Sequence, residues 1–197
     1  YFVMLNIYSN STNQPVTFKV YDASTGNVYP AVEISDDVTF VTNSVVGSMN
    51  NPFIWNAKDL LEQSINMNRG WNWNSIYVQP ESNAVEDIFA PIASIVEIAK
   101  DKEAYAMYGN SQWRGDLDEI NVGKMYKVKM RNATTLSVVG EKVDPAAEVV
   151  KVKSGWNWIG YTASFNMSIA DAFADLNPQD GDVVKSKNDF AIYNSYE

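Results

Sequence analysis

The feature that most limits the possible folds of this chain is an internal repeat. The tetrapeptide Gly-Trp-Asn-Trp (GWNW) at 70–73 recurs at 155–158, 85 residues further on. Matches at four separated places in nearly one register predict two copies of one supersecondary unit, so that both copies fold to the same local structure. The other three matches pair 83–89 with 167–173, 97–100 with 182–185, and 106–108 with 191–193.

Each copy has the same predicted order of elements. A strand, at 64–67 in the first copy and 149–152 in the second, leads into a strand formed by GWNW, and a short helix follows. Alternation of apolar and polar residues then predicts more strands. In the first copy these lie at 94–100, 104–108, 124–130 and 135–140.

The starts of the two helices have matching signals. Asn83 is followed three residues later by Glu86, and Ser168 by Asp171. An N-cap side chain with an acidic partner three positions on satisfies the first free amides of a helix. Asn83 and Ser168 are therefore the predicted N-cap residues.

The first 57 residues show period-two alternation instead of helical spacing. Val16, Phe18 and Val20 share one predicted face, and the polar stretch 22–27 predicts the turn of a hairpin. Several short strands of this kind are typical of a β-sandwich. Residues 57–63 are expected to form a linker.

Both ends of the chain fall inside predicted elements. Tyr1 opens an apolar strand pattern without an initiator Met or a signal peptide, and the second copy stops at Glu197, before a counterpart of Trp113. We expect either a longer natural polypeptide or neighbouring copies that supply the missing strands, because unpaired strand edges favour pairing with another chain.

The predicted fold class is mainly β with short helices (α+β). A partial β-sandwich-like module at 1–57 is followed by a first GWNW unit at 64–148 and a second, truncated GWNW unit at 149–197. Each GWNW unit is β-rich and carries one short helix.

Composition excludes several classes of function. The chain has no His and no Cys, so it has no Ser-His-Asp triad, no Cys nucleophile and no zinc finger. Its net charge of −9 repels nucleic acids. No apolar run approaches the roughly 20 residues that span a bilayer, so no transmembrane segment is predicted.

Carboxylates are the remaining candidates for catalysis or metal binding. A pair of them could hydrolyse glycosides, but the acidic residues occur mostly at helix starts, turns and outward strand positions, which predicts solvated surface and no enzyme. Asp180 and Asp182 offer oxygen ligands for Ca²⁺ without the full spacing of a calcium loop. A turn held by Asx hydrogen bonds is the favoured interpretation, and no cofactor or metal site is predicted.

The tryptophans allow two interpretations. Trp71 and Trp73 share one face of a strand, as do Trp156 and Trp158. Such aromatic rings could stack on sugars, but their recurrence at the same place favours a core that packs the helix onto the sheet. Trp113, on a W-x-G-x-L turn, is the better candidate for an exposed ligand-binding residue, together with Tyr108.

The joint order of motifs carries a resemblance to a known family. GWNW, a short helix, an acidic-hydrophobic-Lys strand, an A-x-Y strand, W-x-G-x-L, GKMYKVKM and TLSVVG occur in this order. This order resembles a repeat module of large secreted and cell-surface proteins of Bacteroidota-type bacteria, and the 17–57 region is similar to a β-sandwich module that often precedes it. The resemblance implies export and a modular, non-catalytic architecture, and it carries over no catalytic residue.

Two functions remain open. The first is a structural or adhesive module of an extracellular bacterial surface protein, with neighbouring modules or other copies as partners and strand edges as contacts. The second is a glycan-binding module that uses exposed aromatic side chains. A row of solvent-facing aromatic rings would favour glycan binding, whereas buried tryptophans with exposed strand edges would favour assembly.

Overall fold

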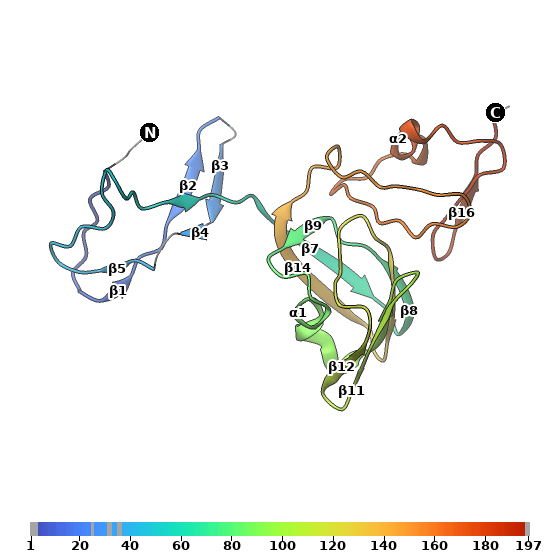
Figure 1. Ribbon diagram of the computed structural model, residues 1–197, viewed down its shortest axis with the longest axis horizontal. Helices are drawn as coiled ribbons and strands as arrows, with labels where there is room; N and C mark the ends of the chain where they lie inside the picture. Colours follow the sequence, from blue (N-terminus) through green and yellow to red (C-terminus); the bar gives the residue numbers. More distant parts are fainter. Residues whose placement is uncertain (1–3, 25, 31–32, 35–36, 196–197) are drawn as a thin grey trace. The chain divides into compact units, whose positions relative to one another are not determined.

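The computed structural model describes residues 4–24, 26–30, 33–34 and 37–195. The chain forms two compact units, an N-terminal unit of residues 1–60 and a C-terminal unit of residues 61–197 (Figure 1). Strands account for 36% of the residues and helices for 10%. The predicted mainly β fold with short helices is therefore confirmed.

The described residues of the N-terminal unit form three two-stranded antiparallel sheets. The predicted hairpin is confirmed: Val20 lies opposite Tyr29, and Gly26 takes a positive φ of 74° in the turn. Phe18 packs against both Phe53 and Trp55, with ring centroids 5.6 and 5.2 Å apart. The strand pairs are β1 (Gln14–Pro15) with β5 (Thr39–Phe40), β2 (Lys19–Asp22) with β3 (Asn27–Pro30), and β4 (Glu33–Ile34) with β6 (Trp55–Asn56).

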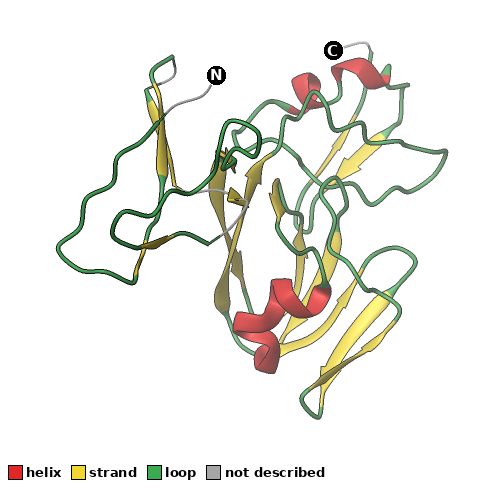
Figure 2. Ribbon diagram, turned by 60° about the vertical axis from the view of Figure 1, so that its left-hand side comes forward, coloured by secondary structure: helices red, strands yellow, loops and turns green. Residues whose placement is uncertain are grey.

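Within the C-terminal unit, the first GWNW copy is built on two antiparallel sheets and one helical segment. The helical segment consists of α1 (Val85–Phe89) and the 3₁₀ helix η1 (Ala90–Ile95), and Figure 2 shows it in red next to the strands. One sheet has the order β7 (Leu60–Met67), β14 (Thr134–Lys142), β9 (Val78–Pro80). The other has the order β12 (Gln112–Gly115), β11 (Tyr105–Gly109), β10 (Val96–Lys100), β13 (Tyr126–Met130), β8 (Gly70–Asn74).

Strict alternation along the strands supplies the core of this unit. Every second residue of β13 is buried, and the same holds in the middle of β14, as expected for sheets with one solvated face. Burial raises the pKa of Tyr126 to about 12, and its hydroxyl accepts a hydrogen bond from the Asn121 amide at 2.8 Å. Side chains of both sheets and of the helical segment meet in one cluster, which includes Met67, Val78, Val85, Phe89, Val96, Val128 and Leu136.

Several predicted boundaries are corrected. Strand β7 begins at Leu60, so four of the seven residues of the expected 57–63 linker belong to a strand. The N-cap of α1 is Ala84 and not the predicted Asn83, and it makes no side-chain cap hydrogen bond. The side-chain amide of Asn83 donates instead to Asn121 Oδ1 at 2.7 Å. Ser168 is confirmed as an N-cap, since its hydroxyl accepts from the Asp171 amide at 3.0 Å.

The prediction that the GWNW tryptophans form the core is wrong for both copies, and in the second copy Trp156 is 63% exposed. Asn72 is buried, with 5% of its surface exposed, whereas Trp71 is 39% exposed on the opposite face of β8. The Asn72 side chain bonds both the amide and the carbonyl of Asn68 and the carbonyl of Gly70, at 2.9, 2.7 and 3.0 Å. These bonds place Asn72 on the inner face, and alternation then places both tryptophans on the outer face.

The second copy repeats the local geometry of the first. Asn157 makes the same three hydrogen bonds, to the amide and carbonyl of Lys153 and the carbonyl of Gly155, at 3.0, 2.7 and 2.9 Å. Both glycines have positive φ, 89° at Gly70 and 85° at Gly155. The side chain of the central Asn therefore shapes the GWNW turn in both copies.

The hairpin that follows also keeps its register. In the first copy Ile98 lies opposite Met107, and in the second Val183 lies opposite Ile192, each 85 residues later. The second copy contains α2 (Ile169–Ala172), the 3₁₀ helix η2 (Ala174–Leu176), β15 (Val183–Lys185) and β16 (Phe190–Ile192). The strands expected at 149–152 and 155–158 are not formed, which corrects the prediction; Ile159 makes one isolated bridge to Lys124.

Within the described ranges, none of the helices has both the length and the apolar character needed to cross a membrane.

Candidate functional site

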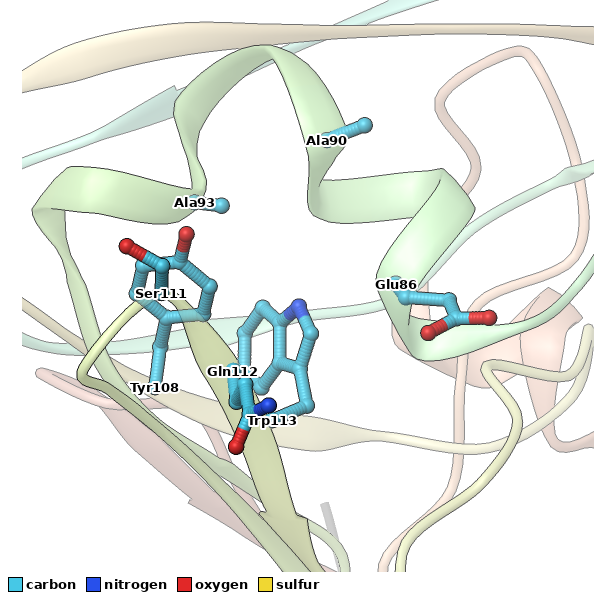
Figure 3. A pocket seen from close by; sticks show the side chains of 7 residues that line it. All are labelled: Glu86, Ala90, Ala93, Tyr108, Ser111, Gln112 and Trp113. Carbon is cyan, nitrogen blue, oxygen red and sulfur yellow. The ribbon is translucent and has the colours of Figure 1, made fainter.

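An open hollow of about 540 Å³ lies between the helical segment and the β11–β12 hairpin. Figure 3 shows the side chains that border it: two small alanines on the helical segment, two aromatic rings on the hairpin, and polar groups around them. We call it the Trp113 hollow. Its lining residues are Glu86, Ala90, Ala93, Tyr108, Ser111, Gln112 and Trp113.

The structure brings the two predicted ligand residues together. Tyr108 and Trp113 lie opposite each other in the β11–β12 pairing, and their ring centroids are 5.2 Å apart at an interplanar angle of 60°. Trp113 also packs on the buried Phe89, at 5.8 Å between centroids. Both residues are half-buried, and Trp113 packs against the core cluster while it also borders the hollow.

Sequence reasoning missed the other lining residues. The sequence pattern identifies Glu86 only as a capping partner of Asn83, and it assigns no role to Ser111, Gln112, Ala90 or Ala93. One signal could have found two of them. Asn110 and Ser111 suit a two-residue turn between alternating strands, and such a turn places Ser111 and Gln112 beside Trp113.

A second candidate surface is the outer face of the five-stranded sheet, which we call the tryptophan–lysine face. It is formed by Trp71, Trp73, Lys100 and Lys127. The ammonium group of Lys127 lies 4.3 Å from the ring centroid of Trp73, and that of Lys100 lies 5.8 Å from the ring of Trp71. Each lysine thus covers an outward-facing ring with its charge and its methylene stem.

The second GWNW segment lies on this tryptophan–lysine face. The ring of Trp158 is 4.2 Å from the ammonium of Lys127 and 5.8 Å from that of Lys100. Lys102 Nζ donates to the carbonyl of Trp156 at 2.8 Å, and the Gly160 amide donates to the carbonyl of Gly123 at 2.9 Å. The two copies are therefore in direct contact through tryptophan, lysine and backbone groups.

Charge within this face is partly compensated. Partial burial, together with the nearby charges of Lys100 and Lys185, lowers the pKa of Lys127. Lys129 Nζ lies 2.7 Å from Glu97 Oε1, and this hydrogen bond lowers the pKa of Glu97. The Lys127 ammonium group interacts with the rings of Trp73 and Trp158 by cation–π contacts, whereas Lys129 interacts with a carboxylate.

The other carboxylates considered in the sequence are used in turns. The Asp180 carboxylate accepts from the amide and the hydroxyl of Ser195, at 2.8 and 3.0 Å, and Asp182 accepts from the amide of Gln179 at 2.8 Å. In the part of the chain that the structure describes, no three Asp or Glu side chains gather as a possible metal site. Asp182 therefore closes the turn at 179–182, whereas Asp180 holds Ser195 from 15 residues away, and neither of these bonds is the Asx bond to an amide two residues further on that the sequence predicted.

The arrangement as a whole offers binding surfaces: an open hollow with aromatic and polar walls, and a sheet face on which one GWNW copy holds the next. Comparisons with protein-family models, with curated proteins and with solved structures found no match to this chain.

Proposed function

We propose that this chain is a non-catalytic structural or adhesive module of a bacterial surface protein, acting outside the cell, in which successive GWNW units pack on one another. The GWNW tryptophans lie on the outer face, which by itself would favour glycan binding, but Lys100 and Lys127 cover the rings of Trp71 and Trp73. The observation that carries the proposal is the position of Trp158 against the same two lysines of the preceding copy. In repeat proteins each unit is stabilised mainly by contacts with its neighbours, and such contacts set the spacing of the array.

The chemistry of this contact recurs in the second copy. Trp156 and Lys185 occupy the positions of Trp71 and Lys100, 85 residues later. Trp156 is 63% exposed, compared with 39% for Trp71. The second copy thus carries, at equivalent positions, one of the two cations that contact Trp158 and the ring that this cation covers, which supports an array built from one kind of contact.

Exposed strand edges give further support for assembly. Within the described residues, β12 and β8 lie at the two ends of the five-stranded sheet, and each pairs with one neighbouring strand. An edge strand is a template for pairing with further strands, including those of a second copy.

Absence of His and Cys removes the residues on which most hydrolytic and redox mechanisms depend. The order of motifs, which resembles that of modules in secreted bacterial surface proteins, supports an extracellular location. Both points favour a structural role over catalysis.

The contact between copies is tested with Trp158→Ala in the full chain. Removing the ring takes away its stacking on two ammonium groups, and we expect backbone amides near Gly160 to exchange hydrogen roughly 5- to 30-fold faster. Hydrogen exchange followed by mass spectrometry measures this. Trp156→Ala is the matched control, and its rates should stay within about twofold of the wild type; equal effects of the two variants would contradict the role of Trp158.

The location is tested on intact cells that produce the protein. An antibody raised against the chain is expected to label unbroken cells or their medium, and added protease is expected to remove cell-bound label without lysis. A signal that appears only after the cells are broken would overturn the extracellular proposal.

A further inference from the structure

We propose that the Trp113 hollow binds one pyranose ring of an uncharged glycan, stacked on Trp113. This proposal is independent of the structural role argued above. Trp113 packs on Phe89 at the inner face of the five-stranded sheet, whereas the contact between the two GWNW copies lies on the outer face. The support comes from the aromatic platform, the polar groups around it and the conformation of one turn residue.

The aromatic platform is held rigid before any ligand arrives. Trp113 is wedged between Phe89 and Tyr108, with centroids at 5.8 and 5.2 Å. The helical segment faces this ring with the methyl groups of Ala90 and Ala93, which leave room above it (Figure 3). A fixed ring with open space beside it suits the apolar C–H face of a sugar, since little side-chain entropy is lost on binding.

The polar groups around the platform are available to a ligand. Within residues 37–195, the side chains of Glu86, Ser111 and Gln112 have no hydrogen-bond partner, and neither has the indole nitrogen of Trp113. Together they offer acceptors and donors on several sides of one hollow. Vicinal sugar hydroxyls require this mixture, because each hydroxyl both donates and accepts.

Charge selects against acidic glycans. Glu86 is the charged residue of the lining, and the whole chain carries a net charge of −9. Both repel uronic acids, sialic acids and sulfated sugars. The class that fits is therefore an uncharged hexose or pentose pyranoside.

The turn between β11 and β12 supplies an independent observation. Gly109 pairs with Gln112, so Asn110 and Ser111 form a two-residue loop, and both have positive φ, 52° and 60°. This is the pattern of a type I′ turn, in which the second position is best filled by glycine, and a serine there costs about 1 kcal/mol. Ser111 lines the hollow, and this position offers a functional explanation for a strained residue that the hairpin itself does not require.

The experiment is a titration of the full chain with a panel of uncharged hexasaccharides: β-1,4-glucan, β-1,4-mannan, β-1,4-xylan and α-1,6-mannan. The six tryptophans give six indole N–H signals in an NMR spectrum, and single Trp→Phe variants assign each signal to its residue. We expect at least one oligosaccharide to shift the Trp113 signal in a saturable way, while the signal of Trp156 stays in place.

Variants separate binding from folding. Ser111→Gly is expected to weaken the affinity at least threefold while the thermal midpoint stays equal or rises, because the turn strain is relieved. Ala90→Gln, at an exposed helical position, fills the hollow and should weaken binding at least tenfold without loss of stability. Trp113→Ala should abolish binding, with Trp156→Ala as the control that binds like the wild type.

Three results would overturn the proposal. The first is a Trp113 signal that no oligosaccharide of the panel shifts. The second is equal affinity of the wild type and of the Ser111→Gly and Ala90→Gln variants. The third is a Trp113 signal that shifts only with a proline-rich peptide, titrated as a probe that is not a sugar. None of them bears on the contact between the two GWNW copies, which is measured by hydrogen exchange at Gly160.

Discussion

Replacing Gly115 by Ala is expected to lower the free energy of unfolding of the C-terminal unit by about 3 kcal/mol or more. Gly115 has a φ of 139°, which residues with a side chain rarely adopt. A Cβ atom there would overlap the carbonyl oxygen of Tyr105 and lie 2.9 Å from its carbonyl carbon. The same oxygen already accepts from the amides of Asp116 and Leu117, at 2.9 and 3.0 Å, so the backbone has little room to move away.

The measurement is urea unfolding of the full chain, followed by NMR signals of the C-terminal unit. Gly109→Ala is the matched control, because Gly109 ends β11 in the same hairpin and a Cβ there meets no atom within 4 Å. Its stability should stay within about 0.5 kcal/mol of the wild type. Loss of stability in both variants would show that the hairpin responds to any added side chain and not to the crowding at Tyr105.

Gly115→Ala should also displace the Trp113 ring. Gly115 pairs with Ala106 in the ladder that sets Trp113 opposite Tyr108. At urea concentrations where the variant is still folded, the indole signal of Trp113 should broaden or move, whereas that of Trp156 should not. This links the stability of β12 to the geometry of the hollow.

Asn72→Ala is expected to destabilise the C-terminal unit by about 2 to 3 kcal/mol. The side chain is buried and bonds three backbone groups of the turn at 68–70, and its amide also lies 3.4 Å from the carbonyl of Val128. Alanine leaves these groups without their partner and opens a small void beside β13. Chemical unfolding measures the loss.

Asn157→Ala is the control that the repeat itself provides. Asn157 makes the same three turn hydrogen bonds, but they are exposed, so water replaces them and the expected loss is about 0.5 kcal/mol. A loss of equal size at both positions would mean that the turn bonds alone, and not burial beneath the sheet, determine the effect.

Local patterns in the sequence predicted most elements of the C-terminal unit. Alternation located β13 and β14 to within two residues, and the 85-residue repeat correctly paired the β10–β11 hairpin with β15–β16. These features depend on contacts between neighbours in the chain or across one turn. Such contacts are set by residue type and spacing, which a single sequence contains.

The candidate site was predictable in part. Trp113 and Tyr108 were named from the W-x-G-x-L and A-x-Y motifs, and they do lie side by side. Glu86, Ala90 and Ala93 were not, because their approach to Trp113 depends on how the helical segment packs over Phe89. That packing joins residues about 25 positions apart, and no local pattern encodes it.

The sequence by itself determined the β-rich class, the two GWNW copies and the equivalence of their hairpin strands, because period and turn chemistry act over short distances. Only the tertiary structure decided which face of β8 is inside. Alternation separates Trp71 and Trp73 from Asn72 but does not say which set is buried, and the hydrogen bonds of the buried Asn72 resolve the choice. The tryptophans are left outside, where lysines of β10 and β13 and the second copy cover them.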